Sequence, residues 1–172
     1  VRSSLIVVAT LLLTPLLTFM VMNRYGISAN LMSLGGLAIA IGIMVDGSVV
    51  VVENTFAKLG ERLKSGDSKN RIILEAASEV GTPVLFGVGI IILVFMPLLS
   101  LEGMEGKMFA PMAITIAIAL TISLILSFTL SPVLCSYILK GGGEDDTKVV
   151  KKLRAPYERW LHWSLAHPKL VV

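Results

Sequence analysis

The sequence predicts an all-α integral membrane protein, and three observations support this prediction. The mean hydropathy of the chain is +0.83. Of its 172 residues, 55% are hydrophobic and 16% are charged, which argues against a soluble domain. The apolar residues gather in four long runs, each long enough to supply the roughly 20 residues that a helix needs to cross a bilayer. Because bare strands leave their backbone hydrogen bonds unsatisfied in lipid, we expect each run to form a helix.

The charges of the loops between these spans predict their orientation. Thirteen of the fifteen Lys and Arg residues lie at Arg2, within residues 58–71, or from Lys140 onward. Basic loops tend to stay in the cytoplasm, so these parts are expected there, and the second span runs from outside to inside. The four expected spans are residues 4–22, 30–52, 80–99 and 108–139.

The chain is expected to contain four parts. Residues 1–139 form a four-helix transmembrane segment. Residues 140–148, with three consecutive glycines followed by three acids, are predicted to be a flexible linker. Aromatic and apolar residues at helical spacing, flanked by basic residues, predict an amphipathic helix on the cytoplasmic membrane surface over residues 149–167. Residues 168–172 end in the apolar Leu170, Val171 and Val172 and are expected to begin another span, so we interpret the chain as a piece of a larger protein.

The composition also limits the classes of ligand that the chain is expected to bind. The net charge of +3 would suggest nucleic acid as a partner of a soluble protein, but the basic loops account for it here. No nucleic acid and no cofactor are implied. Cys135 is the only cysteine, which excludes an internal disulfide and a cysteine cluster for metal.

Two acids mark the second span as the candidate functional element. Asp46 lies inside an apolar run and Glu53 closes it seven residues later. A charge near the middle of a span costs roughly 2.5–3.5 kcal/mol, so an intramembrane acid is a functional-site hypothesis. At about 100° per residue the two acids share one face of a helix with Gly35 and Gly42. Small residues on that line favour close packing against another helix.

Three interpretations of these acids remain open. They could be structural groups satisfied by partners, members of a proteolytic dyad, or proton carriers. A dyad needs two facing aspartates, whereas Asp46 is the only Asp inside a span. Chains of acids recur as proton carriers in pumps and transporters, which favours the third interpretation. The spans contain no Lys or Arg, so a cationic partner would come from outside this chain.

Two segments resemble a known family. Residues 30–54, NLMSLGGLAIAIGIMVDGSVVVVEN, resemble the fourth transmembrane helix of resistance-nodulation-division (RND) efflux pumps. Residues 101–113, LEGMEGKMFAPMA, are similar to the segment that enters the sixth helix in the heavy-metal efflux branch. The resemblance covers essentially the whole chain, as helices three to six, the surface helix and the start of helix seven.

This resemblance implies a secondary transporter, not an enzyme. The parent is expected to be a twelve-helix proton antiporter of the bacterial inner membrane that exports heavy-metal ions. It is expected to be a homotrimer in membrane lipid, working with a periplasmic adaptor and an outer-membrane channel. Asp46 is then the main proton carrier and Glu53 a relay toward the cytoplasm, while Asn54 caps the helix or hydrogen-bonds near that exit. Gly35, Gly42 and Gly47 are assigned to helix packing.

Particular positions favour one metal class. Multidrug pumps usually carry a second Asp where this chain has Gly47, and divalent-metal pumps typically carry an Asp where it has Ala40. These departures resemble the copper and silver branch rather than the cobalt, zinc and cadmium branch. Met32 and Met44 match two methionine positions of that branch and are candidate metal ligands. Further methionines would be expected at three other positions, which are Val51, Leu120 and Cys135 here.

Alternatives to this interpretation stay open. Met32 and Met44 could be apolar filler, since methionine packs readily in irregular cores. The parent could be an RND pump for organic compounds, although Gly47 and residues 101–113 argue against it. It could also be a non-transporting membrane subunit of the same fold, such as a protein-secretion accessory or a sterol-sensing bundle.

Overall fold

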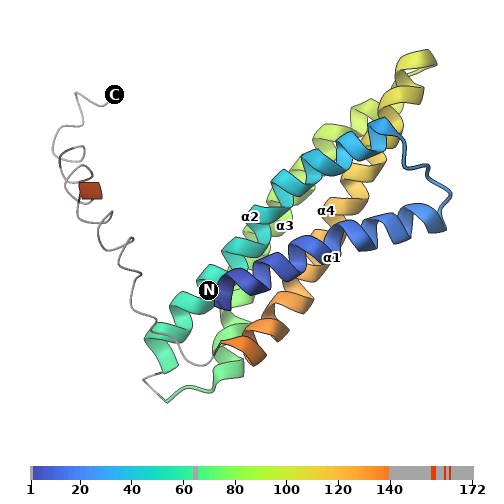
Figure 1. Ribbon diagram of the computed structural model, residues 1–172. Coiled ribbons are helices and arrows are strands. Elements are labelled where there is room, and N and C mark those ends of the chain that lie inside the picture. The colour runs from blue at the N-terminus through green and yellow to red at the C-terminus, as the bar shows by residue number, and fades with distance from the viewer. Residues whose placement is uncertain (1, 64–65, 140–155, 158–160, 162, 164–172) are drawn as a thin grey trace. The chain divides into compact units, whose positions relative to one another are not determined.

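The computed structural model describes residues 2–63, 66–139, 156–157, 161 and 163 of the chain. Every secondary-structure element among them is a helix, which confirms the predicted all-α class. Four helices are long and apolar enough to cross a membrane. The elements are α1 (Arg2–Arg24), α2 (Leu31–Arg62), α3 (Lys69–Phe95), the short 3-10 helix η2 (Met96–Ser100) and α4 (Gly103–Ile138) (Figure 1).

The chain divides into two compact units, Val1–Gly142 and Gly143–Val172. In the second unit the described residues are helical and exposed. They are Pro156, Tyr157, Leu161 and Trp163. The predicted linker, the rest of the predicted surface helix and the predicted start of another span lie outside the described residues, so these boundaries stay predictions.

The second and third helices extend beyond the apolar runs that predicted them. α2 continues to Arg62, whereas the expected span ended at residue 52, and α3 begins at Lys69 rather than at residue 80. Hydropathy marks only the part of a helix that suits lipid. The polar ends of α2 and α3 are stabilised as helix because they pack together through one cluster that contains Leu59, Ile72 and Ile73.

Turn chemistry fixes where the helices begin. Gly26 in the α1–α2 connection and Gly103 at the start of α4 have φ angles of 68° and 71°, in the left-handed region that glycine adopts without strain. Asn30 caps α2, because its side-chain oxygen accepts a hydrogen bond of 2.9 Å from the Ser33 amide. The residue that opens the resembling motif is therefore also the residue that starts the helix.

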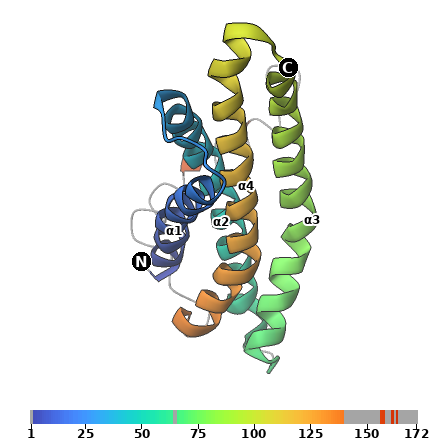
Figure 2. The same ribbon diagram turned by 90° about the vertical axis from the view of Figure 1, so that its right-hand side faces the viewer.

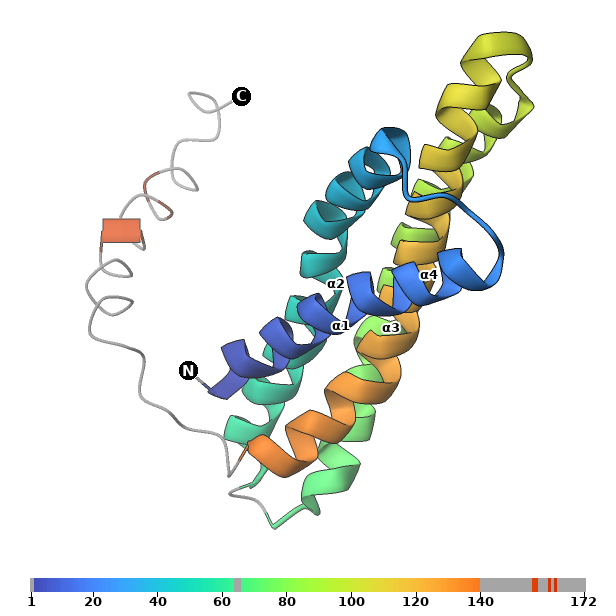
Figure 3. The same cartoon turned by 45° about the vertical axis from the view of Figure 1, so that its right-hand side comes forward.

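Helix α4 packs against each of the other three helices. Figure 2 shows α4 between α1 and α3 with α2 behind it, and Figure 3 shows α1 crossing α4 obliquely. A glycine permits the close approach of α2 to α4. A Cβ added at Gly36 would lie 2.7 Å from the backbone oxygen of Met112, which is closer than side chains allow.

Two clusters of buried apolar residues hold this bundle together. The first cluster joins all four long helices at the end where α2 meets α3; it contains Ile6, Val52, Leu59, Ile72, Ile73, Cys135 and Leu139. The second cluster lies between α2 and α4; it contains Leu37, Ala40, Met44, Ile116, Ala119 and Leu120. Cys135 is buried and free, in agreement with an apolar packing role.

Candidate functional site

The face of α2 that carries Glu53 is open in this bundle. Gly35, Gly42 and Glu53 are all exposed, and a Cβ added at either glycine would meet no atom within 4 Å. Helical periodicity puts position 46 on the same line, inside an unbroken stretch of α2. A helix that packs on this face would have to come from outside the described residues, so the packing roles of Gly35 and Gly42 stay predictions.

The glycines that do contact neighbouring helices lie beside this line. Gly36 faces α4, as described above, and a Cβ added at Gly47 would lie 3.6 Å from Cγ1 of Val84 on α3. Gly47 is thus the one predicted packing glycine with a described neighbour. The contact at Gly36 was not predicted from the sequence. The membrane-spanning part of α2 has apolar residues on every side, so its sequence does not tell which face meets α4.

Glu53 lines a groove between α1 and α2. The groove has a volume of about 390 Å³, and its other walls are Ser3, Ser4, Val7, Val8, Val49, Val52 and Phe56. Two serines and Glu53 are thus the polar residues in the lining of an otherwise apolar groove.

Asn54 faces the opposite neighbour, α3. Its Nδ2 donates to the backbone oxygen of Ala76 at 2.9 Å and to Oε2 of Glu79 at 3.3 Å. Of the two predicted roles, capping is wrong, because α2 continues to Arg62, and hydrogen bonding is what the structure describes. The bond to a backbone oxygen fixes Asn54 at one position along α3.

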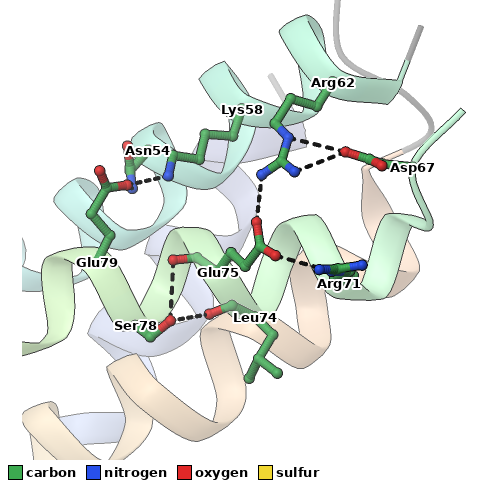
Figure 4. A network of polar contacts seen from close by, with 9 residues as sticks. All are labelled: Asn54, Lys58, Arg62, Asp67, Arg71, Leu74, Glu75, Ser78 and Glu79. Carbon is green, nitrogen blue, oxygen red and sulfur yellow. Dashed lines mark hydrogen bonds and ion pairs between the residues drawn. The ribbon is translucent and has the colours of Figure 1, made fainter. Parts of the chain in front are cut away.

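Ion pairs continue this contact along both helices (Figure 4). Lys58 pairs with Glu79 and Arg62 pairs with Glu75. Arg62 also reaches Asp67 at 2.9 Å, and Glu75 accepts from Arg71 at 3.1 Å. We call Asn54, Lys58 and Arg62 of α2, with Glu75 and Glu79 of α3, the α2–α3 ladder.

The ladder was not predicted, although the spacing of its residues in the sequence indicates it. The three α2 members recur every four residues, and so do the two acids of α3. Side chains four apart lie on the same side of a helix, so two such rows can face each other. The signal was missed because residues 58–71 were interpreted as a loop that sets orientation.

Met44 is buried in the second apolar cluster, together with Ala40 and Leu120. Met112, which is half-buried, packs against the same cluster. Leu120, where a methionine was expected, therefore belongs to the same buried cluster as Met44. Met32 is half-buried and belongs to neither cluster. Among the described residues no three His, Cys, Asp or Glu side chains form a group that could hold a metal ion.

Several hydroxyl groups of α1, α2 and α4 are buried in the bundle. This hydroxyl seam consists of Thr10, Thr14, Thr18, Ser48, Ser123, Ser127 and Ser131. The threonines donate to their own helix, as Thr14 does to the Thr10 oxygen at 2.8 Å. Ser48 and Ser127 instead share a hydrogen bond of 3.0 Å between α2 and α4. Ser131 is the exception, since its buried hydroxyl has no partner among the described residues.

Comparison with known proteins identifies the family. The model of the AcrB/AcrD/AcrF family matches residues 1–172, the whole chain. The chain belongs to this family. Its membership confirms the predicted resemblance to RND efflux proteins.

Several relatives carry names of metal resistance. The nickel and cobalt resistance protein CnrA of Cupriavidus metallidurans is 34% identical over 97% of this chain and 16% of its own length. The cation efflux system protein CusA of Escherichia coli K12 is 36% identical over 99% of the chain and 16% of its own length. The cobalt-zinc-cadmium resistance protein CzcA of C. metallidurans is 37% identical over 100% of the chain and 17% of its own length.

The chain of this AcrB/AcrD/AcrF family member spans about one sixth of the length of these relatives. The relatives agree on the heavy-metal efflux branch of the family, as predicted. Relatives named for nickel and cobalt and for cobalt, zinc and cadmium are about as similar to the chain as the cation efflux protein CusA is. Overall identity therefore does not distinguish between classes of metal.

Proposed function

We propose that this chain is the proton-relay part of a transporter that exports heavy-metal cations, driven by proton uptake. The observation that carries the proposal is the open face of α2. An exposed Glu53 lies on that face, and periodicity puts Asp46 about 10 Å away along the axis at 1.5 Å per residue. Placing an acid in an apolar membrane helix costs free energy, so its presence there indicates a functional role. This supports the relay over a purely structural role.

The two acids have different roles in this proposal. Asp46, in the apolar part of α2, binds and releases one proton in each cycle. Glu53 exchanges that proton with the cytoplasm through the groove between α1 and α2. The groove and the exposure of Glu53 support this order, because a carboxylate that water reaches exchanges protons without crossing lipid.

The setting of the relay follows from family membership. The parent is proposed to lie in the bacterial inner membrane as a homotrimer, with residues 58–71 in the cytoplasm. A periplasmic adaptor and an outer-membrane channel would complete the export path. A helix from elsewhere in the parent would cover the part of the open face around Gly42 and Asp46 and supply the cation that pairs with Asp46.

A substitution that removes titration but keeps shape tests the relay. In the full-length transporter that contains this segment, Asp46→Asn should abolish metal resistance in a growth assay while membrane expression stays unchanged. Glu53→Gln should reduce proton flux in proteoliposomes less than Asp46→Asn does, because Glu53 already has access to water.

Glu61→Gln is the matched control, since Glu61 is an exposed acid on the same helix with no ion pair among the described residues. It should leave resistance and flux intact. Full resistance in Asp46→Asn would refute the relay, and a larger loss of flux in Glu53→Gln would reverse the assignment of the two roles.

A further inference from the structure

The α2–α3 ladder lies next to the proposed relay, although none of its acids was assigned a role. Asn54, one of its members, directly follows Glu53 in the sequence. Neighbouring residues on a helix point about 100° apart, so Glu53 faces the groove with α1 while Asn54 faces α3. Whatever holds Asn54 therefore also sets the direction of Glu53.

Glu79 is the residue on which two α2 side chains converge. Its carboxylate pairs with Lys58 and accepts from Asn54 at 3.3 Å. Asn54 lies one helical turn before Lys58, so the carboxylate of Glu79 contacts two successive turns of α2. The second bond of Asn54, to the Ala76 oxygen, ties the same turn to the backbone of α3.

The order of charges favours one register of α2 against α3. In the observed register each of the two bases meets its own acid, as Lys58–Glu79 and Arg62–Glu75. Shifting α2 by one turn in one direction would bring Lys58 to Glu75.

The same shift would bring Arg62 to Arg71, a like-charge contact, because Arg71 lies one turn before Glu75 on α3. The opposite shift would bring Arg62 to Glu79 and leave Lys58 facing Pro83, one turn beyond Glu79. Each shift thus leaves one ion pair between the two bases and the two acids, where the observed register has two.

We propose that Glu79 is a positioning residue for the relay helix. By holding Asn54 and Lys58 it keeps α2 and α3 in a single register, so the two helices move as one unit in the transport cycle and Glu53 keeps its direction into the groove. This inference rests on the proposed proton relay. It adds a residue on a second helix, α3, that acts through Asn54 and Lys58.

Charge exchange in the full-length transporter tests this role. Glu79→Lys and Lys58→Glu should each slow proton-coupled transport, by roughly 2- to 30-fold, as substitutions that alter coupling between elements do. The double variant Lys58→Glu with Glu79→Lys restores an ion pair of reversed polarity. Asn54 can serve either orientation, because its amide both donates and accepts. The double variant should therefore recover most of the lost rate.

The dependence of transport on pH separates positioning from folding. Glu79→Ala should shift the pH at which the transport rate is half-maximal, since the surroundings of Glu53 change. A variant that merely folds less well would lower the maximal rate and leave that pH unchanged. Glu61→Gln again serves as the control and should show neither effect.

Three outcomes would overturn the inference. One is an unchanged rate and pH profile in Glu79→Ala, and another is a double variant no faster than the slower single variant. If these occur while Asp46→Asn is inactive, the relay stands and only the role of Glu79 fails. The third outcome is active transport by Asp46→Asn, which overturns the relay and this inference together.

Discussion

Ser48 of α2 and Ser127 of α4 share a hydrogen bond of 3.0 Å in the interior of the bundle. Both residues are buried, whereas the seam threonines, all on α1, donate to backbone oxygens of their own helix. The buried hydroxyl of Ser131 on α4 has no partner among the described residues. The bond is thus a directional link between the proposed relay helix and the central helix. Apolar contacts between these helices fix their distance, while this bond also selects their rotation.

The first prediction concerns the strength of that link. Interhelical hydrogen bonds in membrane proteins contribute about 0.6 kcal/mol on average, because polar groups also find partners in the unfolded state within the membrane. Ser48→Ala and Ser127→Ala should each lower the free energy of unfolding of the full-length protein in detergent. A double-mutant cycle should give a coupling energy of about that size.

Thr129→Ala is a suitable control for this cycle. Thr129 lies on the same helix as Ser127 but is exposed, and its hydroxyl donates to its own helix at Ile125. Combined with Ser48→Ala it should show no coupling. Equal coupling for Ser127 and Thr129 would mean that the bond between the helices contributes nothing specific.

The second prediction contrasts two glycines on adjacent faces of α2. Gly36→Ala places a Cβ 2.7 Å from the Met112 oxygen and forces α2 away from α4. Overpacking of this kind typically costs about 1–3 kcal/mol, so the purified protein should unfold more easily. Gly42→Ala meets no atom of the described helices.

If another helix of the parent packs on the open face, a large side chain at Gly42 should impair transport instead. We expect Gly42→Leu to reduce metal resistance more than Ile39→Leu, a conservative change at an exposed apolar position of α2. Equal resistance in these two variants would show that the open face is not a helix interface. Thermal unfolding of Gly36→Ala at the temperature of the unchanged protein would contradict the close approach of α2 and α4.

These contrasts show what hydropathy and periodicity could predict. The four runs of apolar residues were enough to predict four helices, because backbone hydrogen bonding in lipid leaves few alternatives. Periodicity also predicted that Gly35, Gly42 and Glu53 share a face, and all three are exposed together. It did not predict which helix meets which face, since α2 offers apolar residues in every direction.

The polar ends of α2 and α3 show a different limit on what the sequence could predict. Residues 58–71 were interpreted through their net charge, which carries information on orientation but not on pairing. The pairing of Lys58 with Glu79 depends on two helices running past their apolar parts and packing through Leu59 and Ile72. Hydropathy does not predict that a helix extends beyond its apolar part. The ladder could be found only by matching the four-residue spacing of bases on one helix with that of acids on the next.

The last prediction concerns the class of metal that the transporter exports. Met44 and Leu120 belong to one buried cluster, and Ala40 in the same cluster replaces an acid that the resemblance associates with divalent metals. Thioether sulfur favours soft ions such as copper(I) and silver(I), whereas zinc and cobalt are better served by imidazole and carboxylate. We therefore expect the full-length transporter to confer resistance to copper and silver rather than to zinc and cobalt.

Substitutions at this cluster can separate a ligand from apolar filler. Met44→Leu keeps the volume but removes the sulfur, so it should lower copper and silver resistance with little loss of stability. Leu120→Met adds a second thioether to the cluster that contains Met44 and should raise that resistance. Met20→Leu, at an exposed position of α1, is the control and should change nothing. If Met44→Leu leaves copper and silver resistance intact, Met44 is apolar filler. If only zinc and cobalt are exported, the exported ions are divalent. Neither outcome affects the proton relay.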